Sequence, residues 1–415
     1  MGVYAVAYQI TVIIEFCFCI FKKGSFENMK KFVSAVLAVM MLLAVLSTGA
    51  SAEEKTFKNV IVMIGDGMGE NHLEWTKAEY GTDLFVDTLP YQGYSKTNSY
   101  TFTTDSAAGG TALSCGDRAI NGNIGTLAIP MDDYGAVICT YTNSCEIAKD
   151  LGKKTGIVTS DKNSGATPAA FSAHVASRKM TDAICDQQLA SDIDLIWGKA
   201  DSYITEEMAN EAGWTYLDGL SDVEALEKGT KSFGQFVNPV EFPFGNEDEA
   251  PLSYLTGKAI ELLENENGFF LMVEGAHIDK YSHSNDAEGM MKSVLEFDKA
   301  IKTAVEFAEE DGSTLVIVTA DHETGKITFD EDTQEYGFTQ TDHSNTNVPL
   351  RVYGSDELVK DGKAIRNRNV SLFTAKKMGC TNYPAPVMNP KFLPEFFPAL
   401  GKWLAVEIKD LFEGD

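Results

Sequence analysis

The chain has 415 residues, of which 44% are hydrophobic, 10% aromatic and 23% charged. This composition is typical of globular proteins and excludes collagen-like, disordered and multi-span membrane proteins. Lys and Arg number 34 against 61 Asp and Glu, so the formal charge is −27. An acidic surface repels polyanions, which argues against nucleic acid or an anionic membrane as a partner.

Residues 1–52 have the pattern of a targeting segment. The stretch 29–52 begins with Met, followed by two lysines, an apolar run over 32–46 and a small-residue motif that ends at Ala52. This pattern predicts a signal peptide cleaved after Ala52, and therefore secretion to the periplasm, cell surface or medium, with no stable membrane insertion afterwards. Residues 1–28 are interpreted as an extension from a mis-assigned start, which leaves 53–415 as the mature domain.

Apolar runs rich in β-branched residues alternate with segments of helical periodicity. Strands are predicted over 60–64, 155–159, 269–273 and 315–319, and helices over 144–151 and 290–309. The alternation predicts a single large α/β domain with a mostly parallel sheet and helices on both faces. Residues 231–251 are predicted to form a loop or a small insertion, and the tail 392–412 to pack against the domain. The cysteines downstream of the leader are odd in number and irregularly spaced, which favours free buried thiols over disulfides: Cys115, Cys139, Cys145, Cys185 and Cys380.

Polar residues follow three of the predicted strands. Asp66, Glu274 and Asp321 each stand at or just after a strand's carboxyl end. Ligands of open α/β sheets bind at that edge, so these carboxylates are expected to meet in one crevice. Each one taken alone is better explained as a helix cap or turn residue.

Three of the six histidines extend this cluster. Asp279 and His283 are four residues apart, a separation that places both on one side of a helix, and His322 directly follows a strand-end aspartate. His343 adds a further imidazole. Mixed carboxylate and imidazole ligands suit zinc. The other histidines, at positions 72, 174 and 277, are interpreted as ordinary core or surface residues.

Ser106 opens a run of small residues, SAAGGTA, preceded by Thr-Asp. The run predicts a closely packed helix with Ser106 in its first turn, where free backbone N–H groups and the helix dipole favour a phosphate. A simple serine or aspartate cap has the same pattern.

Six segments together are similar to the signature segments of the alkaline phosphatase family, in order and roughly in spacing: VIVMIGDGMG, TDSAAGGTA, ATPAAFSAHVASR, FFLMVEGAHIDKYSH, TLVIVTADH and TDHSNTNVP. The resemblance covers about residues 59–354, with 200–250 matched loosely. It implies a metal-dependent phosphomonoesterase, with two Zn²⁺ and one Mg²⁺ as cofactors. The implied ligands are Asp279, His283 and His343 for the first zinc, Asp66, Asp321 and His322 for the second, and Asp66, Glu274 and Thr167 for magnesium.

The resemblance also implies roles for four further residues. Ser106 corresponds to the nucleophile that becomes a phosphoserine, and Asp105 supports it. Arg178 corresponds to the clamp on two phosphate oxygens. Lys280 occupies a position where some bacterial members also carry Lys, next to the phosphate. Such a site fits the chemistry, because phosphoryl transfer needs charge stabilised on both the entering and the leaving oxygen.

The sequence departs from the family in three places. Gly165 stands where members carry Asp or His, so magnesium is expected to be held less firmly, and Gly165→Asp to tighten it while weakening phosphate binding. Lys280 is then expected to lack that carboxylate partner. Asp161, four residues upstream, is an alternative partner if the loop curls back, but it is expected to be a solvated loop residue. The short segments before Asp66 and between His322 and His343 leave little room for an exchanged arm or a crown insertion. A homodimer is therefore possible but not assured.

Two other functions remain open at this stage. A phosphodiesterase of the same superfamily usually has a Thr nucleophile and no Arg on the phosphate, so Ser106 with Arg178 favours monoesters. A non-catalytic secreted protein that binds phosphate or metal is the other alternative, although every implied ligand position is filled. A sulfatase is excluded, because the CGDR at 115–118 lacks the proline of its CxPxR motif.

Overall fold

The computed structural model describes residues 55–131, 134–236, 251–360, 363–392 and 394. The predicted leader and nearly all of the predicted tail lie outside these residues. From Thr56 onward the described residues belong to one compact unit. Within them, no helix combines the length and the apolar character needed to cross a membrane.

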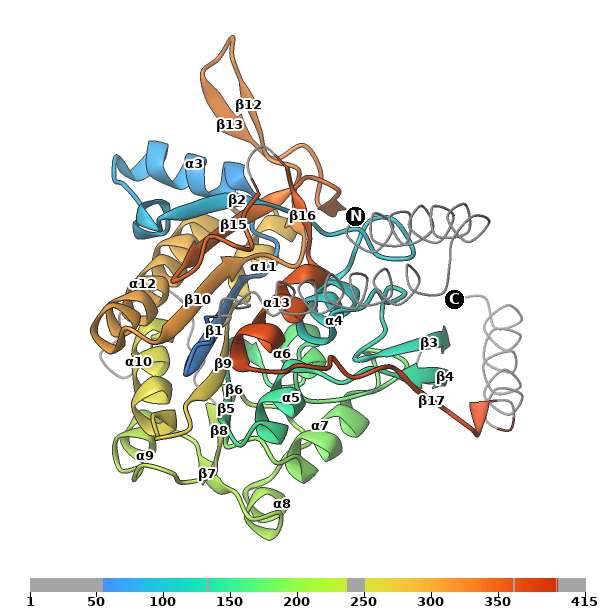
Figure 1. The fold of residues 1–415 in the computed structure, drawn as a ribbon. Coiled ribbons are helices and arrows are strands. Elements are labelled where there is room, and N and C mark those ends of the chain that lie inside the picture. The colour runs from blue at the N-terminus through green and yellow to red at the C-terminus, as the bar shows by residue number, and fades with distance from the viewer. Residues whose placement is uncertain (1–54, 132–133, 237–250, 361–362, 393, 395–415) are drawn as a thin grey trace, which may run out of the picture. The chain divides into compact units, whose positions relative to one another are not determined.

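A ten-stranded sheet forms the centre of this unit, in the order β16-β2-β15-β10-β1-β9-β5-β6-β8-β7 (Figure 1). All its pairings are parallel except the two made by β15. The strands are β1 (Asn59–Gly65), β2 (Tyr91–Lys96), β5 (Lys154–Lys162), β6 (Leu195–Lys199), β7 (Thr215–Leu217), β8 (Ser232–Phe236), β9 (Phe269–Gly275), β10 (Thr314–Thr319), β15 (Val348–Tyr353) and β16 (Ile365–Arg366). The predicted α/β fold and all four predicted strands are confirmed.

Helices cover both faces of the sheet. The described helices are α3 (Glu70–Tyr80), α4 (Ser106–Cys115), α5 (Ser144–Asp150), α6 (Ala166–Ala170), α7 (Thr181–Ala190), α8 (Glu206–Glu211), α9 (Leu220–Glu224), α10 (Leu252–Leu263), α11 (His277–His283), α12 (Ala287–Asp311) and α13 (Arg368–Met378), with a short 3₁₀ turn at Phe85–Thr88. Alternate residues of β1 point to opposite faces. Ile61 and Met63 pack with α10 and α12, whereas Val60, Val62 and Ile64 pack with α5, α7 and α13. Both predicted helices are confirmed, as α5 and within α12.

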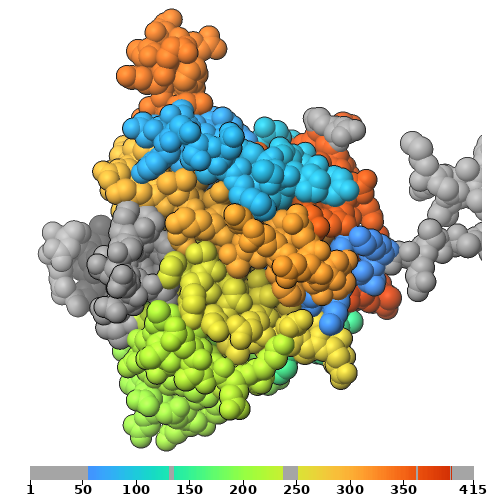
Figure 2. Space-filling model, turned by 90° about the vertical axis from the view of Figure 1, so that its left-hand side faces the viewer, coloured from blue at the N-terminus to red at the C-terminus, as the bar shows by residue number. Residues whose placement is uncertain are grey.

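Three small sheets surround the central one. They are formed by β3 (Thr126–Met131), β4 (Tyr134–Thr140) and β17 (Val387–Met388), by β11 (Glu323–Thr324) and β14 (His343–Ser344), and by β12 (Thr328–Asp330) and β13 (Glu335–Gly337). The β12–β13 hairpin fills the short interval between His322 and His343. It projects from the surface, in orange in Figure 2.

One predicted loop is wrong in part. Residues 232–236 of the predicted 231–251 segment form β8, which pairs with β6 and β7. Its sequence SFGQF lacks the β-branched run of the other strands, yet every residue is buried. The Gln235 amide oxygen accepts a hydrogen bond from the backbone N–H of Asp201 at 2.6 Å, which satisfies one of its buried polar atoms. The predicted free thiols are confirmed: all five cysteines are unpaired and four are buried.

Candidate active site

The carboxyl ends of neighbouring strands bring three acidic residues together. Asp66 follows β1, Glu274 stands near the end of β9, and Asp321 comes two residues after β10, and these three strands are adjacent. All three side chains are buried. Burial raises the pKa of Asp66 well above its usual range, and the nearby charges of Asp321 and Glu274 raise it further. The three carboxylates therefore converge as predicted from the sequence. Three acidic groups buried this close together can all be ionised only if positive charge lies beside them.

Ser106 is the first residue of α4, at the same edge of the sheet. Asp105 is the N-cap of this helix, and its carboxylate accepts hydrogen bonds from the backbone N–H groups of Ala108 at 2.9 Å and Gly122 at 3.0 Å. These bonds fix the first turn. Ser106 is only 4% exposed, so its hydroxyl faces the interior of the site rather than bulk water.

Gly109 allows α4 to approach the acidic cluster. A β-carbon at this position would lie 2.8 Å from the backbone oxygen of Asp321, closer than real β-carbons come. The run of small residues after Ser106 is therefore a packing requirement, because it brings the helix start against the residue that follows β10.

Oxygen atoms of three residues surround one nitrogen of His322. Its Nε2 lies 3.4 Å from Asp66 Oδ1, 3.4 Å from Asp321 Oδ2 and 3.2 Å from Ser106 Oγ. Both carboxylate oxygens are buried and make no hydrogen bond within the described part of the chain. A buried carboxylate oxygen without a partner requires an explanation, and a bound ion between two such oxygens is one that accounts for both.

Thr324 orients this imidazole. Its hydroxyl donates to Asp279 Oδ1 at 2.5 Å and lies 3.2 Å from His322 Nδ1. A hydroxyl has a single proton, and that of Thr324 is donated to Asp279. The Thr324 oxygen therefore accepts a hydrogen bond from His322 Nδ1–H, and the lone pair of Nε2 faces the carboxylates. Sequence reasoning missed Thr324. Its signal was its spacing, two residues beyond His322 in an extended segment and so on the same side.

A second cluster lies beside the first. Asp279 and His283 stand on α11, with His283 Nε2 3.4 Å from Asp279 Oδ2, and His343 Nε2 lies 3.8 Å from Asp279 Oδ1. The two imidazole Nε2 atoms are 3.1 Å apart. The Nδ1 atom of each ring lies next to a backbone carbonyl oxygen. For His283 it is that of Thr341, at 2.6 Å, and for His343 that of Thr104, at 2.8 Å. These carbonyls fix Nδ1–H, so both Nε2 lone pairs point at each other.

The two clusters fit a pair of metal ions. Facing lone pairs repel unless a cation lies between them, and ligand atoms about 2.05 Å from a tetrahedral zinc are about 3.4 Å apart. Ligand atoms of Asp279, His283 and His343 lie within 4.8 Å of one another, as do those of Asp66, Asp279 and His322. The rings of His322 and His343 stack at 3.7 Å between centroids, so the clusters are adjacent. Within the described residues these are the two groups with such geometry.

The residues predicted for magnesium form a third, oxygen-rich corner. Glu274 accepts a short hydrogen bond from the Thr159 hydroxyl, and Thr167 is fully buried at the second position of α6. Burial raises the pKa of Glu274 to about 7, although the Thr159 and Thr167 hydroxyls lower it. Hard oxygen ligands of this kind suit magnesium.

Lys280 is paired, contrary to the prediction. Its ammonium lies 2.7 Å from Asp161 Oδ2, so Asp161 is not a solvated loop residue. A β-carbon added at Gly165 would lie 3.5 Å from the same oxygen. The alternative in which the chain curls back and Asp161 replaces the missing carboxylate is the one observed, because Asp161 lies near the end of β5 and the turn that follows brings Gly165 beside it.

Arg178 lies at the mouth of the site. Its Nη1 is 3.3 Å from Asp105 Oδ2, and its side chain is 41% exposed. Its charge lowers the pKa of Asp66 and of His322, which places the guanidinium within electrostatic reach of the His322 cluster. The three other histidines lie outside both clusters and have other partners: His72 with Ser282, His174 with Glu146, and His277 with Ser160.

Comparison with known proteins agrees with this geometry. The family model described as alkaline phosphatase matches residues 57–210 and 201–379. Alkaline phosphatase 4 of Bacillus subtilis is 33% identical over 350 residues, which cover 74% of this chain and 73% of that protein. The alkaline phosphatase of Escherichia coli is 30% identical over 379 residues, 74% of this chain and 79% of that protein.

A solved structure agrees over a similar span. The alkaline phosphatase from the Antarctic bacterium TAB5 is 31% identical and superposes with a TM-score of 0.67, covering 78% of this chain and 98% of that one. A variant of that enzyme is described with magnesium bound in its M3 site. A family model spanning most of the chain, with relatives at this identity and coverage, shows that the chain belongs to the alkaline phosphatase family.

Proposed function

We propose that the protein hydrolyses phosphate monoesters through a phosphoserine on Ser106. The observation that carries this proposal is the convergence of Ser106 Oγ with carboxylate oxygens of Asp66 and Asp321 around His322 Nε2, at 3.2–3.4 Å. A serine hydroxyl rarely shares a buried site with two orphaned carboxylate oxygens unless cations hold all of them. Membership of the family supports the same reaction.

The residues present fit two zinc ions and one magnesium ion. Asp279, His283 and His343 would hold one zinc. Asp66, Asp321 and His322 would hold the other, on the 3.4 Å distances from His322 Nε2 to both carboxylates. Asp66, Glu274 and Thr167 would hold the magnesium. When bound, zinc favours ionised oxygen nucleophiles at neutral pH and stabilises charge on phosphoryl oxygens. The TAB5 variant with magnesium in a third site supports the magnesium assignment.

The chain's own residues then carry two displacements at phosphorus. Ser106 Oγ loses its proton and bonds to phosphorus, while the bond to the leaving alkoxide breaks and the alcohol takes up a proton. In the second displacement a water oxygen loses a proton and bonds to phosphorus, the bond to Ser106 breaks, Ser106 Oγ takes up a proton, and inorganic phosphate leaves. Asp105 holds the helix start so that Oγ stays in line, and the free N–H groups of the first turn favour the anion.

Arg178 favours monoesters over diesters. Its guanidinium has a planar fork that matches two phosphate oxygens, and a monoester presents more charge to it than a diester does. The Asp105 carboxylate 3.3 Å away limits the orientations of the side chain. Lys280 stands nearby, restrained by Asp161, and would act on the phosphate through a water or directly.

The test is turnover of a chromogenic aryl phosphate beside its diester and sulfate analogues, with and without added zinc. We expect the monoester to be hydrolysed fastest, and chelation to abolish turnover. A preference for the diester would contradict the proposal in favour of a phosphodiesterase. Tight phosphate or zinc binding without any turnover would identify a non-catalytic binding protein.

Export and assembly are proposals of the same kind. We propose that a leader over residues 29–52 directs secretion, so that N-terminal sequencing of exported protein would begin at Glu53. Residues before Met29 on the mature protein would contradict this. We propose no obligatory dimer, and light scattering of the active enzyme would measure its mass.

A further inference from the structure

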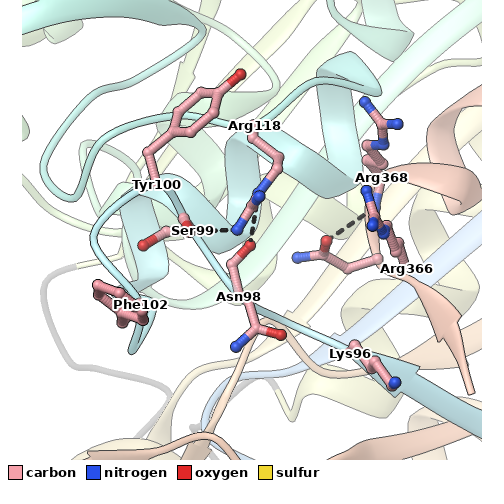
Figure 3. A pocket seen from close by; sticks show the side chains of 9 residues that line it. Lys96, Asn98, Ser99, Tyr100, Phe102, Arg118, Arg366 and Arg368 are labelled. Carbon is pink, nitrogen blue, oxygen red and sulfur yellow. Dashed lines mark hydrogen bonds between the residues drawn. The ribbon is translucent and has the colours of Figure 1, made fainter.

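A basic pocket of about 540 Å³ opens between β2, the segment that follows it and the start of α13. Four cationic and two aromatic side chains dominate its lining (Figure 3): Lys96, Arg118, Arg366, Arg368, Tyr100 and Phe102. None of them belongs to the candidate active site. The volume is within the range of about 300–1,000 Å³ that is usual for small-molecule sites.

The cations are crowded in a way that folding does not explain. Arg366 of β16 is the register partner of Lys96 of β2, and like charges on neighbouring strands repel. Arg368 is the first residue of α13, where the helix dipole disfavours a positive charge. The nearest described carboxylate is that of Asp117, 3.9 Å from Arg368 Nη1. The chain as a whole has a net charge of −27, so a local concentration of positive charge is unusual in it and favours the binding of an anion.

Hydrogen bonds hold the segment that forms one wall of the pocket. Arg118 donates hydrogen bonds to the backbone oxygens of Asn98, at 3.0 Å, and Ser99, and its guanidinium lies 5.2 Å from the centroid of the Tyr100 ring. The Nε atom of Arg368 is buried and has no hydrogen-bond partner among the described residues. A ligand oxygen would satisfy the electrostatic demand at this end of the pocket.

Two aromatic side chains line the pocket together with the cations. In Figure 3 Tyr100 and Phe102 lie on one side of the group and Arg366 and Arg368 on the other. The rings are 53% and 80% exposed. Phe102 also has a φ of +73°, which costs a non-glycine residue about 1–2 kcal/mol. Strained backbone conformations occur preferentially at ligand-binding and active sites, and an exposed ring offers a face on which a flat ligand can stack.

We propose that this pocket binds a small organic polyanion that carries a flat ring, of the nucleoside diphosphate class. Its phosphates contact Lys96, Arg366 and Arg368, and its ring stacks on Tyr100 or Phe102. The site is separate from the phosphoryl-transfer centre, so the proposal stands without the proposed function.

The test uses the zinc- and magnesium-loaded full chain and three probes that it does not hydrolyse. These are α,β-methylene-ADP, methylenebisphosphonate as the anion alone, and adenosine as the ring alone, each titrated by calorimetry. We expect α,β-methylene-ADP to bind at a second, salt-sensitive site besides the active site. The double variant Arg366→Ala, Arg368→Ala should weaken that second site by about tenfold or more, while turnover of a simple aryl phosphate stays within about twofold of wild type.

Lys228→Ala with Lys258→Ala is the matched control, because it makes the same charge change elsewhere and should leave both sites intact. Phe102→Gly should weaken α,β-methylene-ADP but not methylenebisphosphonate. Absence of a second site in the wild type, or its survival in the arginine double variant, would overturn the proposal. Equal affinity for both phosphonates, with no effect of Phe102→Gly, would overturn the ring contact. Failure of the proposed function would instead remove aryl phosphate turnover and leave the second site.

Discussion

The ammonium of Lys280 lies 2.7 Å from a carboxylate oxygen of Asp161, beside the backbone of Gly165. The carboxylate that position 165 lacks is thus supplied from four residues earlier, at the end of β5. Asp161 also acts on the magnesium corner, because its charge contributes to the raised pKa of Glu274. One acidic side chain therefore restrains the lysine and adds negative charge beside the residues proposed to hold magnesium.

Asp161→Asn should free Lys280 and reduce the negative charge near Glu274. We expect inorganic phosphate to inhibit severalfold more strongly and magnesium to be retained severalfold less well. The effect stays modest because the lysine side chain is 45% exposed and water screens its charge. Product inhibition and magnesium equilibrium dialysis measure the two effects, with Asp83→Asn as a control for loss of an exposed carboxylate. Unchanged values for both would show that the pair is only structural.

Gly165→Asp should behave differently in the two backgrounds. In the wild type the added β-carbon would lie 2.9 Å from the Lys162 backbone oxygen, so the turn must shift, and 3.5 Å from Asp161 Oδ2, so the new carboxylate would stand beside a like charge. In the Asp161→Asn background the same substitution should restore part of the magnesium retention. Rescue in the double variant, measured by the same dialysis, would show that the two positions exchange one function. Failure to rescue would argue that only the backbone at 161 places a carboxylate correctly.

Ser106→Ala should remove most monoesterase activity, by several orders of magnitude, while leaving metal content unchanged. The substitution deletes one oxygen and leaves the two carboxylates and the imidazole around it in place. Steady-state turnover with metal analysis of the same preparation is the measurement. Near-normal turnover would mean that a different group attacks phosphorus.

Arg178→Ala should weaken phosphate binding by about tenfold and keep substantial turnover, because the metal ligands are untouched. Arg178→Lys is the informative companion, since it keeps the charge and loses the planar fork. If fork geometry matters, the lysine variant should recover only part of the phosphate affinity. Phosphate inhibition constants for the three proteins give the comparison, and identical constants would place Arg178 outside the substrate site.

Thr324→Val should lower zinc affinity about 10–100-fold, because it removes the hydroxyl that connects Asp279 to His322. Thr324→Ser keeps the hydroxyl and should retain most of the affinity. Competition with a chromophoric chelator measures zinc affinity directly and does not depend on activity. Equal zinc affinity for the valine variant and the wild type would limit Thr324 to packing.

The His174–Glu146 pair should make stability depend on pH. Burial lowers the pKa of His174, but the hydrogen bond and charge of Glu146 outweigh it, so the folded pKa is raised above the unfolded value near 6.5. The stabilisation is therefore complete below about pH 6.5 and is lost as pH rises through the folded pKa. His174→Gln should lower the melting temperature more at pH 6 than at pH 9. Because Glu146 is 46% exposed, the difference should stay below about 1 kcal/mol. An equal loss at both pH values would exclude an ionic contribution.

The predicted strands were correct because a strand buried on both faces needs a continuous apolar run, as in β1, β9 and β10. The acidic residues after them could be placed together for the same reason, since parallel neighbours end at one edge. β8 was not predicted because Ser, Gly and Gln occupy buried positions there, and the Ser232 hydroxyl and the Gln235 amide oxygen find their hydrogen-bond partners only through tertiary contacts. A single sequence does not contain those contacts.

The sequence predicted which acidic and histidine side chains would meet at this edge of the sheet, and the structure brings them together, but it did not predict the residues that orient them. The pairing of Asp161 with Lys280 depends on the path of the turn after β5, and the role of Thr324 depends on the direction of one hydroxyl proton. Neither follows from residue type or spacing alone. For Asp161 the sequence left two interpretations open, a solvated loop residue and a partner of Lys280, and only the position of Asp161 in β5 decides between them.

The residues around His322 Nε2 come from distant parts of the chain. The Asp321 carboxylate, for example, accepts a hydrogen bond from the backbone N–H of Gly67, 254 positions away. An ion bound between Asp66 and Asp321 would therefore close a loop of about 250 residues, as a long-range covalent cross-link does. All five cysteines among the described residues are free thiols, so no disulfide cross-links that part of the chain. A chelator should consequently act on this protein as a reductant acts on a disulfide-bonded one, by loosening the whole sheet, whereas a reductant should leave it unaffected.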